Sequence, residues 1–507
     1  MIVTIYRTDL MLPAGAVGDN TNERMEETMR NAVLTLGLVI LLIGIPSKLP
    51  AADRLDALER ALEAQKKTIE LLQQEINALK QERARQQALE KEVEGLKQAQ
   101  RESRQLTHEV EQLKATAKPK FEAGFDKWQP YIRSTDGNFR LIPTGRIHVD
   151  FRAYEAGARN LPVPPATTGT DLTNNFLVRR GRIGLLGTFY KYFDFFVEAD
   201  FAQGSAVLTD GYLDIHYWPE LRLRAGQFKI PFSYEELLSD NSIDFVERSV
   251  ADNLTPGRDL GAMLHGSLFG GAVNYAAGIF NGSGQNAADT NDSKDLAARL
   301  VFAPFKQTDV ALLRNLHLGA DVTWGEQDSG QSLRGRTDGQ FVFFNRISTR
   351  GDRLRYSGEA AYYAGPFTLY GEYIQSQEER KGLGAGGSNL PDLYGRGWYV
   401  TTTYMLTGET KVPGQTVVPN RWATPVEPER GWGAWELAAR FAQLDFRARD
   451  ITSNRVNALT LGVNWYLTPN VRWLVNFVQN WFSDVNRSEI RGQEAAWEFL
   501  TRLQLWF

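Results

Sequence analysis

The sequence predicts an all-β transmembrane barrel of about 16 antiparallel strands, preceded by a long α-helical coiled coil. Three observations lead to this fold class. The chain ends in strict alternation of apolar and polar residues, and the apolar spacing changes from helical to two-residue near Phe121. Aromatic residues make up 11% of the chain, including 12 Trp and 18 Tyr, which suits the aromatic girdles of a barrel in a bilayer.

The carboxy-terminal strand is the most informative element. It places two sets of side chains on opposite faces, namely Phe499, Thr501, Leu503, Leu505 and Phe507 on one and Arg502, Gln504 and Trp506 on the other. Lipid accommodates the apolar face and a watery lumen the polar one. A strand ending on an aromatic residue resembles the last strand of bacterial outer-membrane barrels, where that residue is the mark read by the assembly machinery. The alternative is an edge strand of a soluble β-domain.

Residues 1–52 are expected to be a signal peptide region. Ala32 to Ile45 form an apolar run of 14 residues, which is short for a membrane span, and Arg30 precedes it. We therefore expect translation to start at Met29 and cleavage to fall near Ala52, where small residues follow the run. An uncleaved membrane anchor is the alternative.

Residues 53–114 have the pattern of a coiled coil. Leucine, isoleucine and valine recur at spacings of three and four with two slips of register, and the stretch 53–118 carries 13 acidic and 13 basic residues. A single helix this polar needs partners for stability, so we expect a homo-oligomer. A solvated spacer helix is the alternative. A linker is expected over 115–138.

From 139 to 507 the two-residue period predicts the outer-membrane barrel. We expect sixteen strands, over 139–153, 176–189, 192–203, 209–218, 221–229, 259–269, 271–280, 295–305, 314–325, 353–364, 366–377, 395–407, 432–445, 456–467, 470–482 and 494–507. Residues 338–348 remain as a hairpin within a loop. Short connections then fall on one rim and most long ones on the other, as in outer-membrane barrels. The long segment 408–431 falls on the short-turn rim without a physical account.

Seven short blocks of the barrel resemble, in order, the porin O and P family of phosphate- and polyphosphate-selective porins. They are residues 139–150, 179–184, 226–232, 245–249, 278–282, 363–367 and 433–440. The resemblance implies a homotrimer of sixteen-stranded barrels in outer-membrane lipid. It also implies passive diffusion of small anions, with phosphate or polyphosphate as solutes. The coiled coil is not part of the well-known members, so its periplasmic location and its role are expectations of our own.

The basic residues of the barrel favour an anion pathway. Residues 119–507 contain 40 basic and 43 acidic residues, and 32 of the 40 are Arg, whose planar fork suits phosphate and carboxylate oxygens. Several alternate with apolar residues and should face the lumen, because charge is costly on the lipid face. The candidates for lining the pore and binding anions are Arg180, Arg182, Arg222, Arg224, Lys229, Arg248 and Arg258. Alternatively, such cations pair with lumen carboxylates such as Asp150, Glu198, Asp200 and Asp214.

Residues 229–258 form the third outward connection, the position at which porins of this family fold a loop into the barrel. Lys229 and Arg248 are carried over to this region from the family's patterns. The segment contains more acidic than basic residues, which argues against phosphate specificity.

We therefore expect an outer-membrane porin for small anions with an Arg-lined pore. The alternative is a general diffusion porin whose coiled coil tethers the outer membrane to the peptidoglycan of the cell wall. The chain has no cysteine, and its five histidines lie in no recognisable catalytic motif. We expect no enzymatic activity, no metal, no cofactor and no nucleic-acid partner.

Overall fold

The computed structural model describes residues 51–116, 121–162, 169–289, 291–310, 312–328, 333–426, 428 and 430–507. The expected signal peptide therefore lies outside the described residues, apart from its last two positions. The chain divides into two units, 1–118 and 119–507, and each is considered by itself. Among the described residues, no helix combines the length and the apolar character that a membrane span requires.

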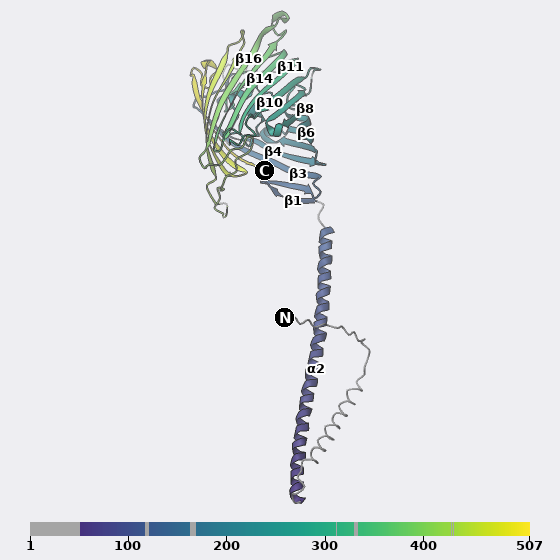
Figure 1. The fold of residues 1–507 in the computed structure, drawn as a ribbon. Coiled ribbons are helices and arrows are strands. Elements are labelled where there is room, and N and C mark those ends of the chain that lie inside the picture. Colours follow the sequence, from purple (N-terminus) through teal and green to yellow (C-terminus); the bar gives the residue numbers. More distant parts are fainter. Residues whose placement is uncertain are drawn as a thin grey trace. The chain divides into compact units, whose positions relative to one another are not determined.

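The described part of the first unit is a single helix, α2 (Ala51–Thr116), of 66 residues (Figure 1). At about 1.5 Å per residue it is roughly 100 Å long. Its apolar seam is exposed along the single chain, with Leu62 at 47% and Ile76 at 42% relative accessibility. The expected helix is confirmed. Its association with other copies stays a prediction.

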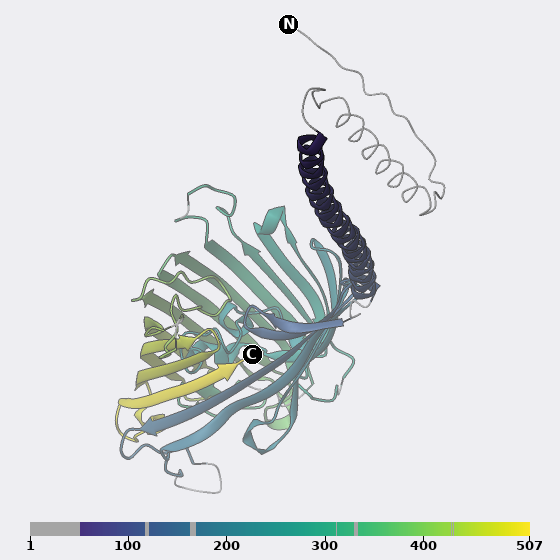
Figure 2. The ribbon, with the colours of Figure 1, turned by 90° about the horizontal axis from the view of Figure 1, so that it is seen from below.

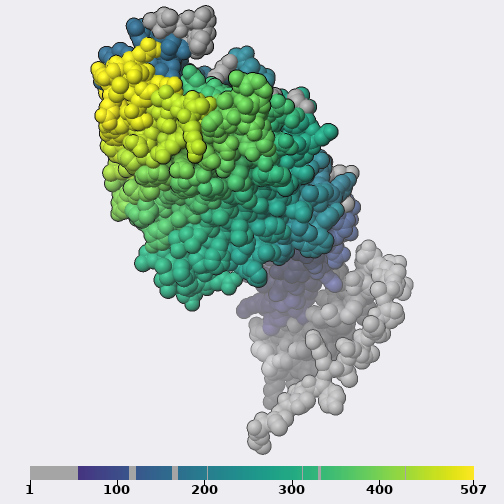
Figure 3. All heavy atoms as spheres, turned by 90° about the horizontal axis from the view of Figure 1, so that it is seen from above, coloured from purple at the N-terminus to yellow at the C-terminus, as the bar shows by residue number. Residues whose placement is uncertain are grey.

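The second unit is a closed antiparallel barrel of sixteen strands (Figures 1 and 2). The strands are β3 (Phe139–Tyr154), β4 (Asn175–Phe189), β5 (Phe193–Asp200), β6 (Val207–Trp218), β7 (Leu221–Lys229), β8 (Arg258–Leu268), β9 (Val273–Phe280), β10 (Asp295–Phe302), β11 (Leu316–Gln327), β14 (Gly351–Ala364), β15 (Phe367–Arg380), β16 (Leu390–Met405), β17 (Ala434–Arg447), β18 (Asn454–Thr468), β19 (Val471–Phe482) and β20 (Ala495–Trp506). Pairing of β20 with β3 closes the ring. Each expected strand is confirmed, with shifts of a few residues at its ends. In Figure 3 the colours run in sequence order over the visible face of the barrel, from yellow through green to teal.

Alternation along the strands separates an outer apolar face from the lumen. On β3, Ile147 and Val149 are exposed on the outside, whereas His148 and Asp150 are buried within the barrel. On β20, Leu503 and Leu505 are exposed, while the alternating residues Arg502, Gln504 and Trp506 are buried. The alternation is the one expected of strands between lipid and lumen.

One expectation is wrong in part, because the range 115–138 is not only a linker. It contains a hairpin, β1 (Phe121–Asp126) and β2 (Gln129–Ser134), and β2 pairs with β3 at Arg140 and Leu141. The last strand, β20, ends opposite Arg146, so this start of β3 would otherwise be a free sheet edge.

Two long connections fold into the lumen and build the core of the barrel. The constriction loop, residues 230–257, lies between β7 and β8 and carries the short helices α3 (Tyr234–Leu237) and η2 (Val250–Leu254). The inner hairpin loop, residues 328–350, lies between β11 and β14 and contains β12 (Gly335–Arg336) and β13 (Val342–Phe344), which confirms the expected hairpin. Apolar residues of both loops pack with inward residues of the wall, and they include Phe232, Val246, Leu254, Phe341, Phe343, Phe446, Val456 and Phe482.

Candidate functional site: the ionic lining of the pore

Two of the cavities inside the barrel flank the constriction loop. The vestibule has a volume of about 750 Å³, is lined by strands β3–β10 and the constriction loop, and reaches Pro219 and Ser267 next to short turns. The loop-side chamber has a volume of about 320 Å³ and is lined by Gly282 and Ser283 of the β9–β10 loop, by the inner hairpin loop and by β14. The vestibule therefore extends toward the short-turn rim, and the chamber extends toward the opposite rim.

The constriction loop separates the two cavities. Lys229 and Asp240 line the vestibule, while Glu236 lines the chamber. These residues are joined by ion pairs, because Arg248 contacts Glu236 at 3.2 Å and Asp240 at 2.9 Å, and Lys229 Nζ lies 3.7 Å from Glu236. The partition is therefore a layer of paired charges with cations on both sides.

Arg180 and Arg182 project from β4 toward the same layer. Arg180 Nε lies 2.9 Å from a carboxylate oxygen of Asp240, and Arg182 lies 3.0 Å from Asp240 and 2.8 Å from Asp200. Both arginines are buried in the lumen. Asp240 thus gathers cations from the wall as well as from its own loop.

Arg222 and Arg224 lie side by side on β7 and share Asp214 of β6. Their Nη2 atoms are 2.9 Å and 2.8 Å from the two carboxylate oxygens, and His265 Nε2 is 2.9 Å from the second. The Arg224 guanidinium also lies 4.1 Å from the centre of the Tyr212 ring. All three basic side chains line the vestibule, whereas the carboxylate lies behind them.

All seven predicted residues therefore face the lumen, but each is paired with a carboxylate. Arg258, the seventh, contacts Asp210 at 2.9 Å. Arg182, Arg222, Arg224, Lys229 and Arg258 line the vestibule, while Arg180 and Arg248 line a smaller cavity of about 100 Å³. The pairing that the sequence left as an alternative is what the geometry shows.

The lining of the vestibule is nevertheless electropositive. It contains seven basic residues, Arg146, Arg182, Arg222, Arg224, Lys229, Arg258 and Arg299, and three acidic residues, Glu198, Asp210 and Asp240. Carboxylates outside this lining, such as Asp214 and Asp321, pair with Arg224 and Arg299. A solute in the vestibule therefore meets more basic than acidic side chains.

A second group of lumen arginines was not among the residues predicted from the sequence. Arg353 and Arg355 of β14 line the chamber together with Arg334, Arg336 and Arg346 of the inner hairpin loop. Arg353 contacts Asp295 at 2.7 Å, whereas Arg355 makes no ion pair with any described residue, and its Nε and Nη1 atoms have no hydrogen-bond partner there. The alternation of Arg353, Leu354 and Arg355 resembles that around Arg222 and Arg224, so the same signal was present.

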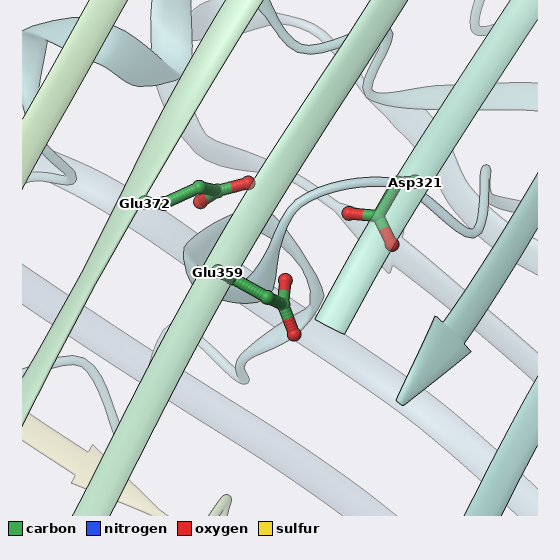
Figure 4. A group of neighbouring side chains, drawn as sticks. All are labelled: Asp321, Glu359 and Glu372. Carbon is green, nitrogen blue, oxygen red and sulfur yellow. The ribbon is translucent and has the colours of Figure 1, made fainter. Parts of the chain in front are cut away.

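An acidic cluster holds the start of the constriction loop. Asp321, Glu359 and Glu372 project from β11, β14 and β15 toward one another, and oxygen atoms of the three carboxylates lie within 4.8 Å (Figure 4). Arg299 donates to Asp321 and to Glu359 at 2.8 Å. Ser233 donates its backbone N–H to Asp321 and its hydroxyl to Glu372, both at 2.9 Å. The cluster is thus an ion-paired anchor of the loop.

Most of the barrel is similar to known proteins. Residues 144–505 match the family model described as phosphate-selective porin O and P. Porin O of Pseudomonas aeruginosa is 24% identical over 424 residues, which cover 74% of this chain and 90% of that protein. Among solved structures, OmpTdeltaL8 of Vibrio cholerae is similar with a TM-score of 0.48 at 11% identity, covering 73% of this chain and 100% of that one. An anion-selective porin from Comamonas acidovorans is similar with a TM-score of 0.45 at 14% identity and the same coverage.

Proposed function

Because the chain belongs to the phosphate-selective porin O and P family, and is therefore an outer-membrane channel and not an enzyme, we propose that it passes small anions. The observation that carries this proposal is the vestibule lining, with its seven basic and three acidic residues. Phosphate is the solute that the family's description names, and polyphosphate is the longer anion expected from the sequence resemblance. Several weak cationic sites in series permit both entry and release of an anion.

The acidic excess of the constriction loop does not oppose this function, because most of its carboxylates are paired with basic residues. Glu235 contacts Arg440 at 3.0 Å, Asp244 contacts Lys411 at 2.5 Å, and Glu247 contacts Arg152 at 2.8 Å. Salt-bridged carboxylates of this kind project little negative charge into the passage. They instead hold the loop against the wall.

The test is the reversal potential of the purified protein in a planar bilayer under a KCl gradient. Arg355 is the residue to replace, because its removal exposes no ion-paired carboxylate among the described residues. Arg355→Met should lower the preference for chloride and weaken the block of chloride current by added phosphate. Arg314→Met is the matched control, since Arg314 is exposed in the 303–315 connection and bonds only the carbonyl of Thr308 among the described residues. A wild-type channel that prefers potassium would overturn the proposal.

We also propose that α2 lies in the periplasm and assembles three copies of the chain into a homotrimer. Its exposed seam supports association, and isoleucine and leucine at both seam positions suit more than two strands. The chain enters the barrel at the start of β3, on the short-turn rim, which is the periplasmic side in outer-membrane barrels. A tether to peptidoglycan is the alternative role of α2. Co-sedimentation with purified cell-wall sacculi that is lost on deleting 53–114 would favour it.

A further inference from the structure

The long connection on the short-turn rim, which the sequence patterns did not explain, packs against the wall of the barrel. This strap, residues 406–433, joins β16 to β17. Its residue Val417 is buried against Met405, Ala434 and Tyr466. Its residue Glu409 is also buried and accepts a hydrogen bond from the backbone N–H of Asn420 at 3.1 Å. The strap is therefore packed onto the rim by its own side chains.

A charged side chain of the strap, that of Lys411, points into the lumen. Lys411 is buried, and its Nζ atom lies 2.5 Å from Asp244, 2.7 Å from Glu436 and 3.2 Å from the Thr403 hydroxyl. Glu436 and Thr403 belong to the wall strands that flank the strap. Asp244, in contrast, belongs to the constriction loop, so Lys411 connects the short-turn rim to the loop that divides the pore.

The contact falls on the tip of the constriction loop, residues 243–246. The wall holds the backbone of this tip through three side chains, because Arg472 donates to the Ile243 carbonyl at 2.8 Å, Asn464 donates to the Asp244 carbonyl at 2.9 Å, and Asn476 accepts from the Val246 N–H at 2.7 Å. These contacts come from β18 and β19, across the barrel from the vestibule. Lys411 adds an ionic contact from outside the strands.

We propose that Lys411 is a positioning residue of the channel, through which the strap 406–433 holds the tip of the constriction loop against the wall and so sets the width of the passage. This goes beyond anion conduction, since it concerns what keeps the partition in place. A buried ammonium between two carboxylates is a strong tie, because removing one partner leaves uncompensated buried charge. Burial disfavours the charged form, but Asp244 and Glu436 together raise the pKa of Lys411, so the ammonium persists at neutral pH.

The absence of cysteine from the chain makes the proposal testable with a single introduced thiol. Ser242→Cys places that thiol next to the tip, and its labelling by an uncharged thiol reagent reports local opening of the loop. Two variants that each remove one negative charge distinguish the ionic contact to the loop from the ionic contact to the wall. Asp244→Asn removes the carboxylate on the loop, whereas Glu436→Gln removes the one on the wall, and each leaves Lys411 with one carboxylate.

We expect Lys411→Met and Asp244→Asn to raise the labelling rate at least about tenfold, as loss of a buried ionic tie should. We expect Glu436→Gln and Lys411→Arg to stay within about twofold of the Ser242→Cys background, because each keeps an ionic contact to the loop. Single-channel currents should show added noise in the first two variants only. Heat-modifiable mobility on gels checks that each barrel is folded.

Equal labelling of the Asp244→Asn and Glu436→Gln proteins would overturn the proposal, and so would a Lys411→Met protein that labels like the background. If Lys411→Met does not assemble, the comparison of the two charge-matched variants decides alone. The labelling rate does not depend on which ions pass. A failure here is therefore distinguishable from a failure of the proposed anion selectivity.

Discussion

Individual arginines of the lumen are held by carboxylates that lie behind them. Asp214 shows the pattern most simply, since one buried carboxylate supports Arg222, Arg224 and His265. The guanidinium groups keep N–H groups directed at the vestibule, and the pairing fixes their orientation. Pairing and function are thus compatible at the scale of the residue.

Replacing Asp214 with Asn should make the channel more anion-selective. The amide keeps the shape of the side chain but removes the negative charge behind two arginines, so the field in the vestibule becomes more positive. The measurement is the reversal potential in a KCl gradient, with Asp309→Asn on the exposed 303–315 connection as control. An unchanged or lower chloride preference in the Asp214→Asn protein would contradict the electrostatic account.

Selectivity should also depend on pH through Asp252 of the constriction loop, which lines the chamber. Burial and the neighbouring Glu236 carboxylate raise the pKa of Asp252 to about 8. The group is therefore mostly neutral at pH 7 and becomes negative as the pH rises through about 8. The stability linked to the raised pKa falls between about pH 4, where an aspartate of the unfolded chain ionises, and about pH 8.

The chloride preference should accordingly fall between pH 7 and pH 9.5, roughly one unit or more on either side of that pKa. Reversal potentials measured across this interval test the expectation. In the Asp252→Asn protein the slope should be clearly smaller, and a wild-type-like slope in that variant would assign the titration to another group.

At the scale of the element, turns that lack the usual turn residues explain why the sequence patterns did not predict the β1–β2 hairpin. The β1–β2 hairpin turns at Lys127 and Trp128, whose φ angles are 47° and 67°. Tight hairpins of this kind usually carry Gly or Asn at positions with positive φ, so no turn signal was visible there. The β4–β5 turn at Tyr190 and Lys191, with φ of 48° and 67°, was found only because long strands flank it.

Helix α2 is an element whose partners lie outside the chain. We predict that a peptide of residues 53–118 forms a trimer, because burying the exposed seam is what stabilises so polar a helix. Sedimentation equilibrium gives the mass, and helicity should rise with concentration. A monomer at high micromolar concentration would defeat the coiled-coil interpretation, whereas a dimer would keep it and correct the trimer.

At the scale of the whole molecule, closure of the barrel depends on the fit between its first and last strands. Phe507 exchanges both backbone hydrogen bonds with Gly145, at 3.0 Å and 3.1 Å. A Cβ atom on Gly145 would overlap the Phe507 ring, so the glycine leaves the space in which the terminal aromatic residue lies. The seam of the barrel therefore relies on one small residue in β3.

Replacing Gly145 with Leu should reduce the amount of folded protein in the outer membrane severalfold, since overpacking of this kind typically costs about 1–3 kcal/mol. The control is Gly358→Leu on the outer face of β14, where a Cβ atom meets open space. Heat-modifiable protein in outer-membrane fractions is the readout. Equal levels for the two variants would show that the seam tolerates a larger residue.

The sequence by itself determined the sixteen strands, the two faces of the last strand and the long helix. All of these follow from local periodicity, which is a property of a single strand or helix and does not depend on its neighbours in space. Only the tertiary structure decided which charges meet. Glu247, for example, gathers Arg152, Arg179 and Arg502, which are between 68 and 255 residues away along the chain. Such pairs, and the reach of Lys411 to Asp244, depend on the height at which each side chain enters the lumen. That height is set by strand register and by the path of two folded-in loops, and periodicity carries no information about either.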